Sequence, residues 1–169
     1  MPSRSSSRAV YPGTFDPFTN GHLDIAERAA AIFEELLVAV SADSGKQPMF
    51  SLDERVEMAR EACGHLANVQ VAPFDGLIVD FARSRGARAL VKGLRTATDF
   101  EREMQMAMMN RSLAPGLDTL LLLADSRYAF LSSGLVREVC GLGGDVSAYV
   151  PESVLPRLVG RLQPGRDRP

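Results

Sequence analysis

The strongest constraint on the fold is the alternation of five short apolar runs with segments of helical periodicity. The runs consist mainly of Val, Leu and Ala, and they span residues 8–11, 36–41, 69–72, 88–91 and 119–123. Continuous apolar strands are typical of a sheet covered on both faces, and alternation with helices makes such a sheet parallel, with right-handed crossovers. We therefore predict an α/β fold: a Rossmann-like open five-stranded parallel sheet with helices on both faces.

Apolar residues at three- and four-residue spacing predict helices within residues 25–36, 56–63, 77–82, 104–113 and 135–139. Two capping boxes, Ser51 with Glu54 and Thr98 with Glu101, predict where two of these helices begin. No internal repeat or low-complexity linker divides the chain. We therefore expect one domain over residues 1–162, with a short terminal helix within 151–162 and a flexible tail over 163–169.

The charge balance limits which partners the protein could bind, and the cysteines indicate the cellular compartment in which it works. The chain carries 19 Lys and Arg against 21 Asp and Glu, a net charge of −2, so no overall positive field would hold a nucleic acid. No apolar run approaches the ~18 residues of a membrane helix, and Pro12-Gly13 interrupts the first apolar stretch before it could form a secretory signal. Cys63 and Cys140 stand alone, which favours buried thiols. We expect a cytoplasmic protein with no nucleic-acid or membrane partner.

Polar and glycine-rich segments follow four of the five predicted strands. They span residues 11–22, 41–50, 92–95 and 124–133. In open parallel sheets, ligands bind beyond the carboxyl ends of the strands, where the strand order reverses. We therefore expect these four loops to meet at one edge of the sheet and to form the ligand site there.

The segment over residues 11–22 is suited to bind an anion. Gly13 and Gly21 allow close approach of the backbone, and the helix that follows directs free N–H groups into the same space. His22 lies in the first turn of that helix, so its imidazole is expected to project into the crevice rather than into the core. The alternative is a satisfied structural histidine. The only other histidine, His65, is explained more simply as a partner of a helix C-terminus.

Lysine is confined to two positions, Lys46 and Lys92, among the 19 basic residues, and both lie in loop-like contexts next to glycine. A compact, mobile point charge suits a phosphate, whereas the alternative is chance retention. We expect both ammonium groups to join His22 as positive groups around one phosphate.

Five segments in order resemble the nucleotidylyltransferase superfamily, whose (H/T)xGH motif matches the end of residues 11–22. Within it, the chain is most similar to the bacterial phosphopantetheine adenylyltransferases of coenzyme A biosynthesis. The resemblance covers residues 9–162. It rests on Tyr-Pro-Gly-Thr-Phe-Asp-Pro-Phe-Thr-Asn-Gly-His at 11–22, Lys46 with Pro48-Met49-Phe50, Lys-Gly-Leu-Arg at 92–95, Asp99-Phe100-Glu101 through Met109-Asn110, and Leu-Ser-Ser-Gly-Leu-Val-Arg at 131–137.

This resemblance implies a reaction, in which the adenylyl group of ATP is transferred to 4′-phosphopantetheine to give 3′-dephospho-coenzyme A and pyrophosphate, with Mg²⁺. Such an in-line displacement accumulates negative charge, and an acceptor that is already a phosphate anion needs no general base. The resemblance implies that Thr14 and His22 bind the α-phosphate and that Lys46 bridges the reacting phosphates. The sequence shows no metal-ligand set, and we expect phosphates and water to hold the Mg²⁺.

The resemblance also assigns the two substrate sites. For ATP these residues are Thr14, Phe15, His22, Lys92, Gly93, Arg95, Glu103, Tyr128, Leu131, Ser132, Ser133 and Gly134. For the acceptor they are Thr14, Lys46, Leu77, Lys92, Met106, Asn110 and Glu138. Two positions depart from the family pattern: Lys92 where Arg is frequent, and Gly134 where a third Ser or Thr is usual.

Several of these residues have plainer explanations. Arg95 could pair with Asp99 or Glu103 on the surface, and Lys92 could simply end a strand. Ser132 and Ser133 could be helix N-caps alone.

Packing alone would also explain some of the others. Tyr128 could pack at a strand end instead of stacking on adenine, and Asp16 could form a turn instead of contacting ligand. Met104 and Met108, on a methionine-rich helix, are interpreted as core filler.

Two other functions are alternatives for a chain with these motifs. A nicotinamide-dinucleotide adenylyltransferase would usually carry His at position 19, where this chain has Thr19. A non-catalytic ATP sensor would need the glycines but not His22, Lys46 and Lys92 together. The resemblance further implies a homohexamer, and feedback binding of coenzyme A is a related expectation, because product and acceptor share the pantetheine arm.

Overall fold

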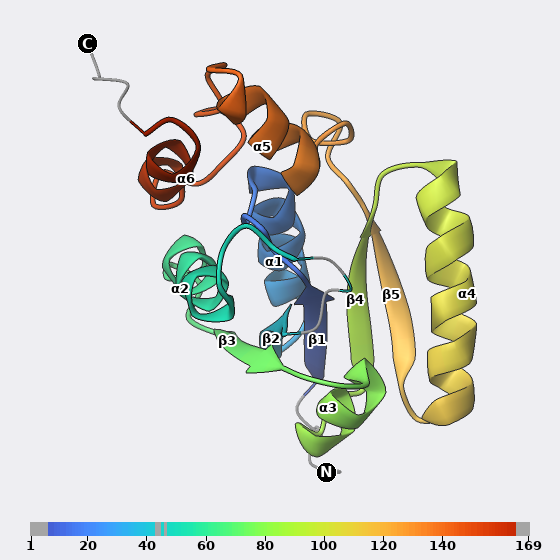
Figure 1. Cartoon of the computed structure of the whole chain (residues 1–169). Helices are drawn as coiled ribbons and strands as arrows, with labels where there is room; N and C mark the ends of the chain where they lie inside the picture. Colours follow the sequence, from blue (N-terminus) through green and yellow to red (C-terminus); the bar gives the residue numbers. More distant parts are fainter. Residues whose placement is uncertain (1–6, 43–44, 46, 165–169) are drawn as a thin grey trace.

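Five parallel strands form one sheet in the order β3-β2-β1-β4-β5, which confirms the predicted fold class. The structure is a computed structural model that describes residues 7–42, 45 and 47–164 (Figure 1). The strands are β1 (Arg8–Gly13), β2 (Glu35–Ser41), β3 (Val69–Phe74), β4 (Ala89–Leu94) and β5 (Asp118–Leu123). From β1 the chain extends the sheet first on one side and then on the other, so the order reverses between β1 and β4. A ligand site is expected at that point.

Helices cover both faces of the sheet because neighbouring residues of the central strands point to opposite sides. The helices are α1 (Asn20–Ile32), α2 (Leu52–Ala62), α3 (Ile78–Ser84), α4 (Ala97–Leu113), α5 (Ser133–Gly141) and α6 (Leu155–Leu162). On β1, Tyr11 packs in one buried cluster with α1 and α2, whereas Val10 packs in another with α3. The helix α4 runs alongside β5 (Figure 1).

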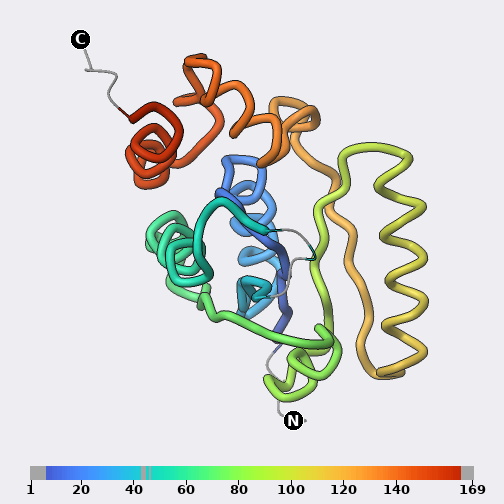
Figure 2. The backbone as a smooth tube through the Cα atoms, in the orientation of Figure 1, coloured from blue at the N-terminus to red at the C-terminus, as the bar shows by residue number. Residues whose placement is uncertain are grey.

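A third buried cluster joins α5 and α6 to the rest of the domain. Met58 of α2 and Phe50 before it pack with Val136 of α5 and Leu158 of α6. Figure 2 shows the chain returning after β5 to place α5 and α6 together, beyond the N-terminal end of α1. Most of the predicted flexible tail, residues 165–169, lies outside the described residues. At its start, the Gln163 side-chain amide donates to the Cys140 carbonyl at 2.6 Å.

One of the two predicted capping boxes is in place. Ser51 caps α2, and its partner Glu54 accepts from the Ser51 N–H at 2.7 Å. The box at Thr98 was wrong, because α4 begins two residues earlier. The Thr96 hydroxyl accepts from the Asp99 N–H at 3.1 Å, so Thr98 lies inside the helix. Because β4 ends at Leu94 and α4 already begins at Ala97, the N-cap is Thr96 rather than Thr98.

The core-filler interpretation of Met104 and Met108 was also wrong. Met104 is 41% exposed and Met108 is 67% exposed, and α4 contributes no buried residue. The methionines of α4 therefore form an apolar surface on this chain. Cys63 and Cys140 are both buried and unpaired, as predicted. Among the described residues, no helix is long and apolar enough to cross a membrane.

Candidate active site

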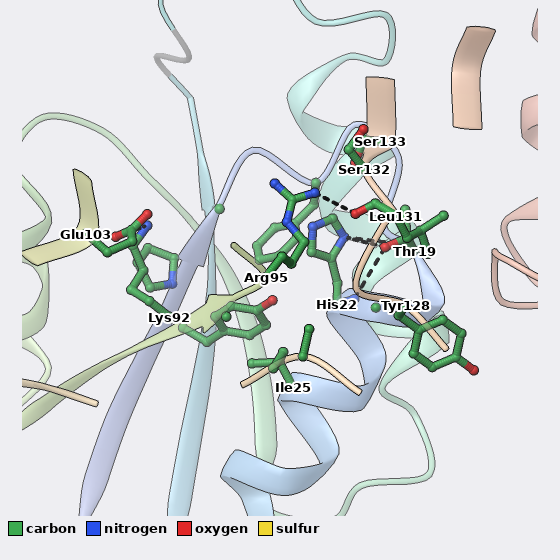
Figure 3. A pocket seen from close by; sticks show the side chains of 17 residues that line it. Thr19, His22, Ile25, Lys92, Arg95, Glu103, Tyr128, Leu131, Ser132 and Ser133 are labelled. Atoms are coloured by element: carbon green, nitrogen blue, oxygen red, sulfur yellow. Dashed lines mark hydrogen bonds and ion pairs between the residues drawn. The ribbon is translucent and has the colours of Figure 1, made fainter. Parts of the chain in front are cut away.

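A cavity of about 260 Å³ opens where the strand order reverses (Figure 3). Three of the four expected loops line it, around residues 11–22, 92–95 and 124–133. A second cavity of about 400 Å³ adjoins it and includes Ser41 at the start of the fourth loop. Lys92, Arg95 and Glu103 line both cavities and are called the shared wall here. The expected convergence of loops is therefore present, divided between two adjoining cavities.

The turn after β1 is set by the packing of Phe15 against Gly13. Phe15 is buried and has a φ of 52°, a left-handed conformation that a non-glycine residue rarely adopts. A Cβ at Gly13 would lie 2.6 Å from the tip of the Phe15 ring, so any side chain there would require the buried ring to shift. The same ring meets the His22 imidazole edge to face, with centroids 5.0 Å apart. This packing directs the start of α1 toward the first cavity.

His22 forms the capping box that begins α1. Its Nδ1 accepts a hydrogen bond from the Thr19 N–H at 3.0 Å, and the Thr19 hydroxyl accepts from the His22 N–H at 3.3 Å. Because Nδ1 is an acceptor, the neutral ring carries its proton on Nε2. The imidazole lines the first cavity beside Arg95 (Figure 3). His22 is thus both a structural cap, as the plainer interpretation had it, and a cavity residue.

The expectation that His22 is a cation does not hold at its buried position. Burial, and after it the positive charge of Arg95, lower the pKa of His22 to about 4. At neutral pH the imidazole is therefore an uncharged hydrogen-bond donor. The positive charge among the described residues of the cavities comes instead from Lys92, Arg95 and, in the second cavity, Arg102.

The shared wall is held by ion pairs and by a carbonyl across the cavity. Lys92 Nζ lies 3.5 Å from a Glu103 carboxylate oxygen, and Arg95 Nε lies 3.3 Å from an Asp99 oxygen. Arg95 also donates to the Leu131 carbonyl at 2.6 Å, next to the start of α5. The predicted pairing of Arg95 with Asp99 is present, but the residue also faces both cavities. The Arg95 guanidinium thus contacts both Asp99 of α4 and the backbone just before α5, and it lines both cavities.

The N-terminus of α5 borders the first cavity with two hydroxyls. Ser132 caps the helix, because its Oγ accepts from the Leu135 N–H at 3.1 Å. Ser133 donates instead to the Pro17 carbonyl at 2.8 Å and ties α5 to the loop after β1. Two helix N-termini, those of α1 and α5, therefore border one cavity, an arrangement that favours anions.

A comparison with known proteins places the chain in a family. A sequence model described as cytidylyltransferase-like matches residues 10–139. The phosphopantetheine adenylyltransferase of Heliobacterium modesticaldum is 56% identical over 150 residues, which cover 89% of each chain. The chain belongs to the phosphopantetheine adenylyltransferase family. The phosphopantetheine adenylyltransferase of Finegoldia magna is 50% identical over 157 residues, which cover 93% of this chain and 97% of that protein.

The fold is also similar to that of a solved structure with low sequence identity. A solved structure provisionally described as a nicotinate-nucleotide adenylyltransferase from Vibrio parahaemolyticus superposes with a TM-score of 0.65. The superposition covers 92% of this chain and 96% of that one at 17% identity. At that identity the likeness concerns the sheet and its helices alone.

Most residues that the family resemblance assigned to ATP line the first cavity. These are Phe15, His22, Lys92, Gly93, Arg95, Glu103, Tyr128, Leu131, Ser132 and Ser133. Thr14 lines the second cavity instead. Gly134 lies in the first turn of α5, exposed and outside both linings.

The residues assigned to the acceptor are less closely gathered. Thr14, Lys92, Met106 and Asn110 line the second cavity. Leu77, 58% exposed before α3, and Glu138, exposed on α5, line neither. Lys46 lies outside the described residues. The roles of all these residues remain predictions.

Sequence reasoning left Asp16 open and missed its partners. Asp16 is buried behind the loop rather than exposed to a cavity, and its two carboxylate oxygens accept from the Met49 and Phe50 N–H groups at 2.8 and 2.9 Å. Arg137 donates to the Asp16 carbonyl and lies 3.3 Å from its carboxylate. A polar residue in a loop is normally expected to face solvent, so no signal in the sequence indicates these buried contacts of Asp16. In the described part of the chain, no three His, Cys, Asp or Glu side chains gather as a metal site.

Proposed function

We propose that this protein transfers the adenylyl group of ATP to 4′-phosphopantetheine, giving 3′-dephospho-coenzyme A and pyrophosphate. The observation that carries the proposal is the pair of adjoining cavities with a cationic shared wall at the switch point of the sheet. One cavity suits the nucleotide and the other the acceptor, so the two phosphates would meet at the wall. Membership of the phosphopantetheine adenylyltransferase family supports the same pair of substrates.

The chemistry is an in-line displacement at the α-phosphorus of ATP. An oxygen of the acceptor phosphate bonds to that phosphorus, the bond to the β-phosphate oxygen breaks, and pyrophosphate leaves with the electron pair. The attacking oxygen is already anionic, so no side chain has to remove a proton. What the protein supplies is orientation and stabilisation of the negative charge that gathers on the transferring and leaving oxygens.

The described residues divide this work between them. The Nε2–H of neutral His22 donates to an α-phosphate oxygen, while Lys92 and Arg95 offset the charge from the shared wall. Ser132, Ser133 and the free N–H groups of α5 hold the β- and γ-phosphates. Thr14 and Lys46 complete the site as the family resemblance implies. Among the described residues of the first cavity Glu103 is the only carboxylate, so an Mg²⁺ ion bound with ATP would be held mainly by phosphate oxygens and water and would offset the phosphate charge.

The acceptor lies in the second cavity in this proposal. Met106 and Asn110 of α4 offer an apolar and an amide contact to the pantetheine arm there, and Leu77 and Glu138 extend the contact beyond the cavity as the resemblance implies. Coenzyme A carries the same arm, so it competes for this cavity and provides feedback. We place the reaction in the cytoplasm.

The family resemblance also leads us to propose a homohexamer. Supporting this, α4 buries no residue within its own chain, and Phe100, Met104, Met108 and Leu113 are exposed along it. An apolar face of this kind on a helix is typical of a contact between subunits. Light scattering coupled to size exclusion gives the mass directly: a hexamer is expected, and a monomer would refute this part.

Pyrophosphate release from MgATP with and without 4′-phosphopantetheine tests the reaction. Release that requires the acceptor, with dephospho-coenzyme A found by mass spectrometry, is the expected result. Binding of ATP without turnover in the presence of acceptor would refute the proposal and favour an ATP sensor. Adding EDTA to the same assay is expected to abolish turnover, because the triphosphate charge is then no longer offset by the metal ion.

A further inference from the structure

The guanidinium of Arg55 is buried beneath the two loops that face the second cavity. Arg55 lies on α2 and is only 1% exposed, and it is among the largest fully buried side chains of the domain. Its Nη1 donates to the Thr14 carbonyl at 2.7 Å and to the Ser41 carbonyl at 2.9 Å. Its Nε donates to the Phe50 carbonyl at 3.2 Å. One side chain therefore joins three separate points of the backbone.

The three carbonyl acceptors of Arg55 lie in or next to the loops at the second cavity. Thr14 and Ser41 line the second cavity, at the ends of β1 and β2. Ser41 and Phe50 are the two ends of the segment 42–49, which carries Lys46. Asp16 fixes the far end of that segment again, through the Met49 and Phe50 N–H groups. Arg55 and Asp16 thus form a buried layer that holds Ser41 on one side and Met49 and Phe50 on the other.

Burying the charged side chain of an arginine costs desolvation free energy that an apolar side chain would not. Among the described residues no salt bridge joins Arg55 to a carboxylate. Burial lowers the pKa of Arg55, the charge of Asp16 opposes that effect, and the three carbonyls accept its hydrogen bonds. A methionine would fill a similar volume without that cost. What the guanidinium adds is a rigid plane of donors that fixes the relative positions of its acceptors, which the single ammonium of a lysine does not do.

We propose that Arg55 is a positioning residue, which holds the backbone at Thr14, Ser41 and Phe50 in the relative positions that adenylyl transfer requires. Arg55 lines neither cavity, so it acts through the residues that it holds. The inference rests on the proposed function. It adds to that function a link from α2, remote from both substrates, to the alignment of the two phosphates.

The proposal separates binding of ATP from turnover. The groups of the first cavity are held by other partners: His22 by Thr19, Arg95 by Leu131, and Ser133 by Pro17. Loss of Arg55 therefore leaves the KM for ATP within about threefold. It lowers kcat by roughly 100-fold, the scale on which loss of alignment between reacting groups reduces rates.

The test compares R55M and R55K with V56A, a matched control on the same helix. Val56 is buried in the cluster beneath β1 and β2, and its truncation destabilises α2 without touching the three carbonyls. Both Arg55 variants are expected to lose kcat at nearly unchanged KM for ATP, whereas V56A keeps the wild-type kcat. If V56A loses as much kcat at a similar melting temperature, or if R55K and R55M raise the KM for ATP and keep kcat, Arg55 is not a positioning residue.

Hydrogen exchange gives a second readout that does not depend on activity. In R55K, which retains the charge and nearly the size, the Met49 and Phe50 amides are expected to exchange at least tenfold faster, with exchange of the His22 amide unchanged. Equal exchange in R55K and the wild type would overturn the inference even if the wild type proved inactive. Absence of dephospho-coenzyme A with wild-type protein would instead refute the proposed function alone.

Discussion

The neutral imidazole of His22 makes a measurable prediction about stability at acid pH. The ring has a pKa of about 4 in the folded chain, against about 6.5 in an unfolded one. Between these values the unfolded chain holds a proton that the folded chain does not, so the free energy of unfolding falls as pH falls. The stability is complete above about pH 6.5. At pH 4.5 the loss that His22 causes is about 2.5 kcal/mol, from the two pKa values and about 1.4 kcal/mol per pH unit.

Urea unfolding of the wild type and H22Q at pH 7.5 and pH 4.5 isolates this contribution. Glutamine is a standard third residue of a capping box and does not titrate, so it keeps the start of α1. The carboxylates titrate alike in both proteins and cancel in the difference. The stability of H22Q relative to the wild type is expected to rise by about 2.5 kcal/mol at the lower pH.

Nuclear magnetic resonance gives the same pKa directly. The chain has two histidines, so H65Q identifies which imidazole signal belongs to His22. A His22 signal that titrates near pH 6.5, or a stability difference between wild type and H22Q that does not change with pH, would refute the neutral-donor interpretation.

Three further substitutions test separate parts of the site and the fold. H22A is expected to keep the ATP dissociation constant within tenfold while kcat falls about 100-fold, measured by calorimetry and pyrophosphate release; an equal fall in binding and rate would mean a ground-state contact. G13A forces a Cβ to within 2.6 Å of the Phe15 ring, and urea unfolding should show a loss of about 1–3 kcal/mol, against no loss if the ring moves freely. M108E places a charge on the exposed face of α4 and is expected to yield smaller assemblies in light scattering, with an unchanged mass arguing against that face.

The fold was predictable because its determinants are local. Strands buried on both faces leave continuous apolar runs, as at residues 36–41, and a capping box such as Ser51 with Glu54 marks a helix start. The exposed methionines of α4 show the limit of this reasoning. Periodicity indicates that a helix has an apolar face, but it does not tell whether that face packs within the chain or against another molecule.

The site was predictable where loops follow strands, and less so where charge or burial decides. The first cavity gathers residues from the turns after β1, β4 and β5, as parallel topology requires. The neutral state of His22 depends on its burial and on the charge of Arg95, a residue far from His22 in the sequence. Arg55 was missed because a charged residue on an amphipathic helix is normally interpreted as solvent-facing.

A peptide group, rather than a side chain, sets the polarity that the His22 ring offers to a ligand. The Thr19 amide hydrogen occupies Nδ1, so the opposite nitrogen must present a hydrogen rather than a lone pair. Most substitutions at position 19 leave that amide in place, and proline alone deletes it. The first peptide of a helix thereby decides whether an incoming phosphate oxygen meets attraction or repulsion.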